Sequence, residues 1–281
     1  MPAARETDPR GFTLVELVVV VVLVGILGYV GVTLLGGMVR GYTDAGARQE
    51  LAGTGRMAVE RAVREVRRGV PGSFRCDDGA CDGAGRMSFL SAGAGGRYVA
   101  TGPADSRLQV RRDGDTFTAY GLEGLDPDWQ LVVYPMDADA LHGGAGSGPR
   151  SRVAAVDDRS SGETIEHRIT LADSDSFPRH PPARRVYGVD RQVTLCCAPA
   201  EGELRLAVSG PPGDADALDN PTDHCGAHGV VLAEGVAECR FTHKPATPTR
   251  SALVRLYLAL EHPGSGETLD FLQEVQVRNA P

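Results

Sequence analysis

The chain has no excess of basic residues and few aromatic ones. Its 281 residues carry 29 Lys and Arg against 37 Asp and Glu, which gives a formal net charge of −8, and 5% of them are aromatic. Contacts with phosphate groups need concentrated positive charge, so this balance argues against a general nucleic-acid-binding protein. The local exception is the Arg-rich stretch from Arg56 to Arg68, which we interpret as a solvated face or a subunit contact rather than a DNA contact.

Motifs that mark common enzymes are also missing. The sequence contains no G-x-S-x-G, no H-E-x-x-H and no plausible Cys–His nucleophile pair, which argues against a membrane-tethered hydrolase. The glycine-rich runs at residues 91–96 and 143–148 lack the Lys-Ser/Thr pair and the following helix pattern of a phosphate loop. We therefore expect no enzymatic activity, no cofactor and no metal ion.

Formal charge is absent from Leu17 to Val39, a run of about 23 residues that would form roughly 34 Å of helix. That length matches the hydrocarbon core of a bilayer and exceeds the apolar core of a secretory signal, and no convincing Ala-x-Ala site follows it. Because the region after Arg40 is too large and polar to be a loop, Arg5 and Arg10 mark the cytoplasmic end. The sequence thus predicts a single-pass membrane protein whose remainder is exported.

Glu16 stands at the head of this apolar run, where an unpaired carboxylate is costly. A charge inside a membrane helix costs several kcal/mol on insertion scales and indicates a functional role. The alternative is that Glu16 lies at the membrane interface and remains in water. The physics of the sequence leaves both interpretations open.

The residues Gly11-Phe12-Thr13-Leu14-Val15-Glu16, with the polar leader before them and the uncharged run after them, resemble the signature of type IV prepilins and pseudopilins. The resemblance implies that a prepilin peptidase cuts after Gly11 and then methylates the new terminus at Phe12. It also implies that Glu16 pairs with the Phe12 ammonium of a neighbouring subunit during filament assembly. An ion is tolerated in a low dielectric only when it is paired, which would explain the carboxylate.

The same resemblance implies the partners and the location of the protein. Its partners would be the prepilin peptidase, other major and minor pilins packed helix against helix, an inner-membrane assembly platform and membrane lipid, and no nucleic acid is expected. The protein would lie in the bacterial inner membrane with a cytoplasmic N-terminus and a periplasmic domain. From there it would move to a pilus at the cell surface.

Three further stretches resemble the minor pilins called MshO, of the mannose-sensitive haemagglutinin type of pilus. Residues 57–75 resemble the end of their N-terminal helix and the following Pro turn, and residues 230–243 and 271–281 resemble their closing segments. The region of residues 95–180 departs from that family. The resemblance predicts a minor pilin that helps to initiate or cap pilus assembly. A minor pseudopilin of a type II secretion system, similar to pseudopilin J, is the alternative, and an adhesin or DNA-uptake tip is a further one.

The patterns predict an α+β fold, in which a long N-terminal transmembrane and amphipathic helix packs on an antiparallel β-sheet, as in pilins. Residues 1–11 would be the leader, 12–39 the transmembrane and assembly helix, 40–70 its exported continuation and 71–281 a globular β-rich domain. The continuation carries an apolar stripe and ends before Pro71-Gly72. The stripe consists of Val59, Val63, Val66 and Val70.

Glycines between the two halves of the helix predict a bend or a local unwinding over residues 36–55, since each costs about 1 kcal/mol in a helix relative to alanine. Beyond the helix, β-rich runs predict a series of short strands, and Asp113-Gly114 predicts a hairpin turn. The strand patterns are 107–112, 116–121, a run starting at Trp129, runs ending at Leu171 and Cys197, and runs starting at Glu203, Ser251 and Thr268.

Six cysteines behind an export-type N-terminus favour disulfides over a zinc site, because no regular pair of C-x-x-C motifs is present. Cys76 and Cys81 can close a small loop. Adjacent Cys196 and Cys197 should point to opposite faces of a strand and pair elsewhere. Cys225 and Cys239 can bracket a strand turn. The connectivity of these six disulfide candidates is otherwise open.

Overall fold

The computed structural model describes residues 13–110, 116–142, 149–172, 177–210, 225, 229–246 and 250–277 of the chain. The chain divides into two compact units, Met1–Gln49 and Glu50–Pro281, and helix α1, Leu14–Arg67, contributes residues to both. Strand pairs between the described residues are antiparallel. The predicted α+β class, with one long helix and antiparallel sheets, is therefore confirmed.

The glycine-rich stretch of α1 is helical at every residue from 36 to 55. The prediction was a bend or a local unwinding; the unwinding is absent from these residues, and the bend stays a prediction. Each glycine costs about 1 kcal/mol in a helix, but long helical stretches on both sides propagate through the glycines without a new nucleus, which is the expensive step.

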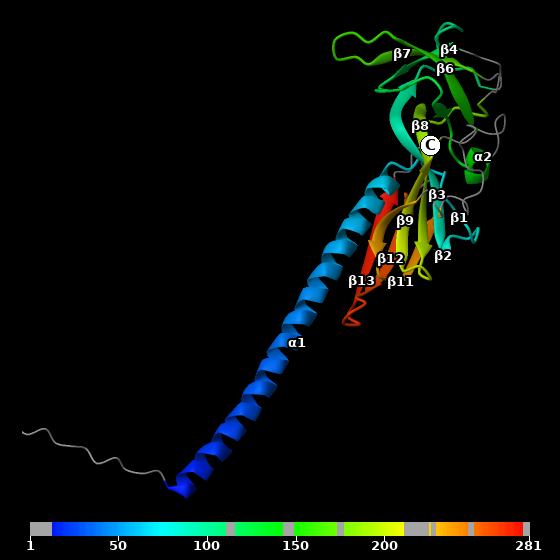
Figure 1. The fold of residues 1–281 in the computed structure, drawn as a ribbon. Helices are drawn as coiled ribbons and strands as arrows, with labels where there is room; N and C mark the ends of the chain where they lie inside the picture. The colour runs from blue at the N-terminus through cyan, green and yellow to red at the C-terminus, as the bar shows by residue number, and fades with distance from the viewer. Residues whose placement is uncertain are drawn as a thin grey trace, which may run out of the picture. The chain divides into compact units, whose positions relative to one another are not determined.

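The second unit contains the C-terminal part of α1, a short helix α2 and the strands (Figure 1). Helix α2 spans Ala138–His142. The strands are β1 (Arg75–Cys76), β2 (Asp82–Ala84), β3 (Arg86–Tyr98), β4 (Thr116–Tyr120), β5 (Gln130–Val132), β6 (Arg150–Asp158), β7 (Glu166–Leu171), β8 (Arg185–Ala198), β9 (Glu203–Ser209), β10 (Val230–Glu234), β11 (Val236–Lys244), β12 (Ala252–Glu261) and β13 (Thr268–Val277).

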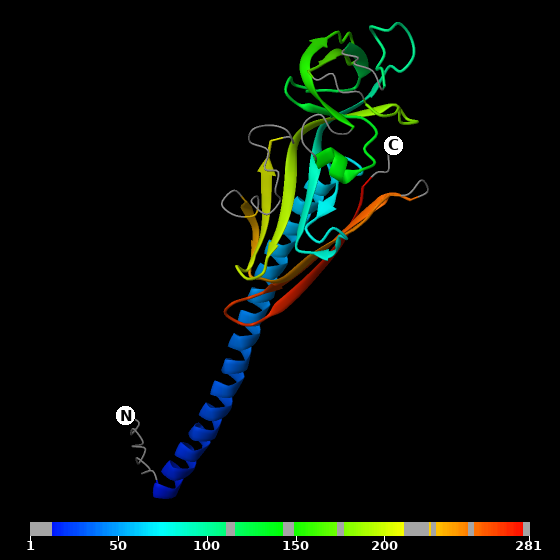
Figure 2. The ribbon, with the colours of Figure 1, turned by 90° about the vertical axis from the view of Figure 1, so that its right-hand side faces the viewer.

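The C-terminal part of α1 packs into a core between two sheet layers. The smaller sheet has the order β13-β12-β11-β2, and the facing layer contains β3, β8, β9 and β10 of the larger sheet. Ala62 of α1 shares this core with Met87 and Leu195 of the larger sheet and with Phe241 and Val254 of the smaller one. Figure 2 shows the two layers, yellow-green and orange to red, beside this part of the helix.

The predicted apolar stripe forms the buried face of α1. Val59 and Val66 are buried and Val63 is half-buried against this core, whereas Val70 lies beyond the end of the helix and is buried in a separate cluster with Leu90. The helix ends at Arg67, before the predicted limit of residue 70, because the next residues join the edge of β3. The N–H of Val70 donates to the Leu90 carbonyl oxygen at 2.8 Å, and Gly69 forms a β-bridge with Ser91.

The described strands of residues 95–180, a region that resembled no family segment, join β3 and β8 in a closed β-barrel with a core of its own. The larger sheet runs β1-β3-β4-β7-β6-β5-β8-β9-β10, and β3 also pairs with β8, so that β3, β4, β7, β6, β5 and β8 close into a ring. Phe117, Val153 and Ile169 are fully buried inside it. The long β3–β8 ladder therefore serves two cores, since Met87 and Leu195 lie in the sandwich and Val186 lies in the barrel.

Some strand predictions were wrong or incomplete. Residues 107–110 of the predicted hairpin are not a strand, and the turn at Asp113-Gly114 lies outside the described residues. Strand β3 was missed because its Ser-Ala-Gly-Ala-Gly-Gly run has low β propensity, and pairing with β8 overrides that preference.

Candidate assembly site

The described part of the candidate site is the first turn of α1, where Thr13 caps the helix. The N–H of Glu16 donates to Thr13 Oγ1 at 3.3 Å, and the N–H of Leu17 donates to the Thr13 carbonyl oxygen at 3.2 Å. Thr13 thus occupies the N-cap and Glu16 the third helical position, which is the spacing of a capping box. Sequence reasoning missed Thr13, although the pattern Thr-x-x-Glu could have revealed it.

Glu16 is exposed in the single chain and has no ion-pair partner among the described residues. It lies in the first helical turn, where the unpaired N–H groups carry a partial positive charge that stabilises a carboxylate. The helix therefore holds the carboxylate in place without neutralising its full charge. Gly11 and Phe12, the predicted cleavage and methylation residues, lie outside the described residues.

The apolar segment that contains Glu16 in its first turn is long enough to cross a membrane. It spans Leu14–Leu35, and none of it is buried inside the structure. The core helix of a soluble protein would bury such a surface, whereas Val18, Val22 and Ile26 remain more than half exposed. This helix is consistent with a single-pass protein anchored in the inner membrane.

All six cysteines form disulfides. Cys76 pairs with Cys81, Cys196 with Cys225 and Cys197 with Cys239, at Cα–Cα distances of 5.1, 5.7 and 5.7 Å. Cys225 and Cys239 are therefore not bonded to each other. Adjacent Cys196 and Cys197 bond in different directions, as expected from the alternation of side chains along a strand. The Cys197–Cys239 bond joins β8 to β11, and so ties the two layers of the sandwich together.

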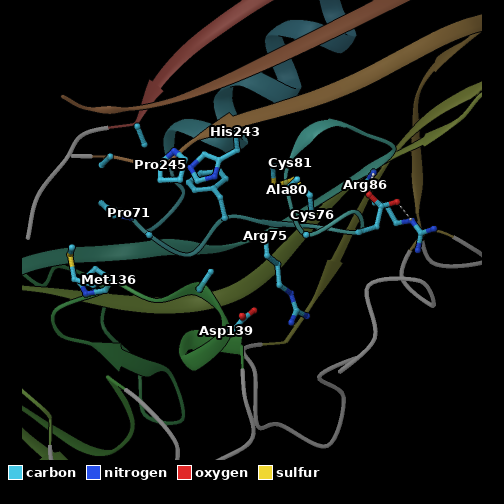
Figure 3. A pocket seen from close by; sticks show the side chains of 18 residues that line it. Pro71, Arg75, Cys76, Ala80, Cys81, Arg86, Met136, Asp139, His243 and Pro245 are labelled. Carbon is cyan, nitrogen blue, oxygen red and sulfur yellow. Dashed lines mark hydrogen bonds and ion pairs between the residues drawn. A yellow bond between two sulfur atoms is a disulfide. The ribbon is translucent and has the colours of Figure 1, made fainter.

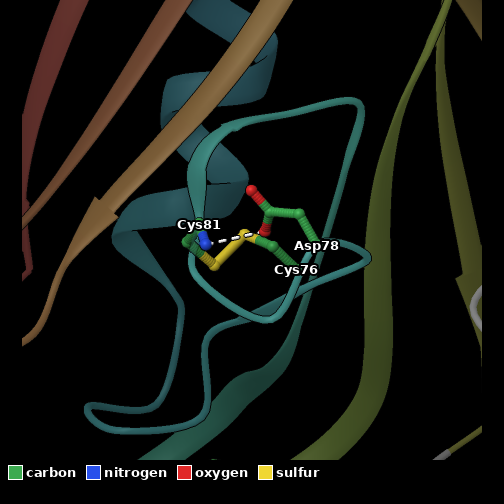
Figure 4. A group of neighbouring side chains, drawn as sticks. All are labelled: Cys76, Asp78 and Cys81. Atoms are coloured by element: carbon green, nitrogen blue, oxygen red, sulfur yellow. Dashed lines mark hydrogen bonds between the residues drawn. A yellow bond between two sulfur atoms is a disulfide. The ribbon is translucent and has the colours of Figure 1, made fainter.

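Cys76, Asp78 and Cys81 lie close enough to suggest metal ligands, but the two sulfurs are bonded to each other (Figure 4). A disulfide removes the thiolates on which a sulfur site for a metal depends. The Asp78 carboxylate accepts hydrogen bonds from the N–H groups of Cys81 at 2.7 Å and Asp82 at 3.2 Å. The carboxylate therefore stabilises the disulfide loop itself.

A cavity of about 590 Å³ opens beside this loop, at the turn that follows α1 (Figure 3). Pro71, Met136 and Pro245 contribute apolar surface to its lining, and His243 lies on it from β11. The His243 ring stacks on Phe74 with 5.2 Å between centroids, and its Nε2 has no hydrogen-bond partner among the described residues. Burial lowers the pKa of His243 to about 4, so the imidazole is neutral at physiological pH.

This burial predicts a loss of stability in acid. The unfolded chain protonates His243 near pH 6.5, whereas the folded chain does so only near pH 4, so the stabilising contribution is complete above pH 6.5 and falls between those values. His243→Leu should remove about 2–3 kcal/mol of the stability loss between about pH 7 and about pH 4.5. Urea unfolding of the detergent-solubilised chain measures it, with His262→Leu, on the turn after β12, as the matched control. An unchanged pH slope would contradict the assignment.

Comparison with known proteins finds a family match at the N-terminus, over the candidate assembly site. Residues 8–28 match the family model of the prokaryotic N-terminal methylation motif. No curated protein and no solved structure matches the chain. The matched stretch contains Gly11, Phe12 and Glu16 and about the first two thirds of the apolar segment. The motif and the capped apolar helix together indicate a type IV pilin-like or pseudopilin protein.

Proposed function

We propose that this chain is a minor type IV pilin, similar to MshO, that helps to initiate or cap pilus assembly. The observation that carries the proposal is the methylation motif of residues 8–28, which leads directly into an apolar helix with Glu16 in its first turn. Prepilin peptidase would cut after Gly11 and methylate Phe12. The helix would then leave the membrane by packing against the helices of other pilins.

The role of Glu16 follows from the cost of an unpaired charge. Among the described residues, its carboxylate has only the positive end of the helix as a source of positive charge, and that end supplies a fraction of a unit charge. A neighbouring subunit that presents the Phe12 ammonium would neutralise it fully. Because only the correct axial offset between helices brings the two groups together, this pair would fix the register of the subunit in the filament.

The disulfides support export of the second unit. Disulfides persist in oxidising compartments such as the bacterial periplasm and are rare in the cytosol. All three bonds lie in Glu50–Pro281, after the apolar helix. This arrangement fits an N-terminus in the cytoplasm and a second unit in the periplasm.

Two observations favour a minor pilin at a filament end. Strands β4 to β7, which lie between β3 and β8 in the chain and complete the barrel, enlarge the second unit, and a terminal subunit has fewer neighbours to accommodate than one repeated along the filament. The segments that resemble MshO are also structurally connected, since α1, β11 and β13 meet in one core. A minor pseudopilin of a type II secretion system is the second candidate, because the methylation motif is common to both classes.

Deletion of the gene in the native bacterium separates the two candidates. Loss of most surface pili, restored by the wild-type gene, with normal secretion of exported enzymes is the result expected of a minor pilin. Electron microscopy counts the pili, and enzyme activity in the culture medium measures secretion. Normal piliation with blocked secretion would contradict the minor pilin and support the pseudopilin. Normal piliation together with normal secretion would contradict both candidates.

A further inference from the structure

A basic groove lies in the second unit where the end of α1 meets the base of the barrel. Its volume is about 930 Å³. Four arginines line it: Arg67, Arg68, Arg97 and Arg185. Arg67 is the last residue of α1 and Arg68 follows it, Arg97 is near the end of β3, and Arg185 begins β8. The groove thus brings together arginines that are more than 100 residues apart in sequence.

The positive charge of this basic groove is not neutralised by the residues that line it. No Asp or Glu is among the described residues of the lining, and these four arginines form no ion pair within the described parts of the chain. The nearby Asp190 lies behind Gly93 and pairs with Arg191 at 3.5 Å. Arg67, Arg68 and Arg97 are exposed, so their guanidinium groups can reach a ligand.

The floor of the basic groove is a stretch of unpaired strand edge. One edge of β3 pairs with β8. On its other edge, residues 68–70 are hydrogen-bonded to β3 as far as Ala92, and β4 pairs with β3 from Arg97 onward. Between these points, residues 93–96 have no second strand partner in the described structure. An added Cβ at Gly95 would meet nothing within 4 Å, whereas one at Gly93 would meet Trp129 and one at Gly96 the Tyr120 carbonyl, so the open space lies at Gly95.

An aromatic wall completes the basic groove. Tyr120 lines it and is 41% exposed. The Tyr187 hydroxyl, which is half-buried, is hydrogen-bonded to Arg185. Tyrosine offers an apolar face and a polar tip, and arginine offers a planar fork that matches a carboxylate or a sulfate. Hydroxyl groups of a ligand could pair with the open backbone groups of residues 93–96.

We propose that this basic groove binds an acidic oligosaccharide. Arg67, Arg68, Arg97 and Arg185 bind its carboxylate or sulfate groups, Tyr120 packs on a sugar ring, and the edge of β3 hydrogen-bonds its hydroxyls. This ligand class fits a site that combines separated cations, one aromatic face and free backbone groups. The inference goes beyond assembly, and it concerns the second unit alone, so its failure would leave the role of the N-terminus untouched.

Nucleic acids and peptides fit the basic groove less well. Sequence-independent binding of single-stranded DNA relies on successive bases stacked on several rings, and Tyr120 is the one largely exposed ring in the described lining. Duplex DNA needs an extended basic surface, and the net charge of −8 would repel its phosphate groups. A peptide added as a strand would find a free edge of only residues 93–96, closed at its ends by Arg68 and Tyr120.

Binding of defined probes to the full chain in nonionic polyoxyethylene detergent tests the proposal. The probes are a polygalacturonate hexasaccharide, which carries carboxylates, a heparin hexasaccharide, which adds sulfates, neutral maltohexaose, an oligodeoxythymidine and a glutamate-rich peptide. Isothermal titration calorimetry should detect at least one acidic hexasaccharide and no maltohexaose. The affinities for the two acidic sugars show whether carboxylate or sulfate is preferred.

Variants locate the binding. Arg97→Gln/Arg185→Gln should weaken binding of the acidic hexasaccharide by about tenfold or more, since hydrogen bonds to charged groups are lost. Arg67→Gln/Arg68→Gln, at the exposed end of α1, gives a second test if the first variant misfolds. Arg159→Gln/Arg240→Gln removes the same charge elsewhere and should leave the affinity unchanged. Equal weakening by that control, no binding of either acidic sugar, or binding of the oligonucleotide or the peptide in their place would overturn the proposal.

Discussion

Glu16→Ala is expected to reduce the incorporation of this chain into filaments by roughly tenfold or more, because removal of one partner from a buried ion pair costs about 3–5 kcal/mol. The variant should still be inserted into the membrane and processed, since alanine at position 16 leaves the other residues of the segment Leu14–Leu35 in place and removes its charge. The defect would therefore appear at assembly alone. Comparison of the membrane pool with sheared pili by immunoblotting separates these steps.

The choice of substitution identifies the cause of the defect. Glu16→Gln keeps the shape and removes the charge, so it should behave like Glu16→Ala. Glu16→Asp keeps the charge on a shorter side chain and should recover part of the incorporation. Glu50→Ala removes a carboxylate from an exposed position of α1 outside the apolar segment and serves as the matched control. Normal incorporation of Glu16→Gln would show that the pairing with Phe12 is wrong.

Phe241→Ala is expected to destabilise the second unit by about 3–5 kcal/mol, the usual cost of a large-to-small change in a closed core. Phe241 is fully buried on β11 and lies in the core that joins α1 to both sheet layers. Ala62 and Val66 of α1 line the same small void as Phe241, together with Met87 and Leu195. Truncation would leave a cavity at the contact between the helix and both sheets.

Because whole domains are stable by only about 5–15 kcal/mol, this loss should be visible as a large shift of the urea midpoint. Leu272→Ala on β13 is the matched control, since its side chain is 63% exposed and surface changes are usually within about 0.5 kcal/mol. Phe241→Leu should fall between the two. A Phe241→Ala effect as small as that of Leu272→Ala would contradict the described core.

The helix and most of the strands could be predicted because local patterns and tertiary packing agree there. The stripe at Val59, Val63 and Val66 marks the buried face of α1, and alternation along β12 marks its inner side. The glycine-rich part of β3 could not be predicted. Its residues have little preference for a strand, and only the long ladder with β8 specifies their conformation. The closure of the barrel depends on the same long-range pairing.

The assembly residues could be proposed from the sequence because they lie within one short motif. Glu16 stands out as a carboxylate beside an uncharged run, and its spacing from Gly11 and Phe12 is local. The basic groove could not be proposed in this way, because Arg67, Arg97 and Arg185 meet only through the fold. The same holds for the disulfide between Cys197 and Cys239, whose partners lie on different sheets.

The intact mass of the mature protein, extracted from membranes of the native bacterium, tests the central claim most directly. Processing predicts a chain that begins at Phe12, lacks residues 1–11 and carries one added methyl group on its N-terminal nitrogen. Fragmentation of the N-terminal peptide assigns that group. A mature chain that retains Met1, or one that begins at Phe12 without the methyl group, would contradict the account of how this N-terminus is processed.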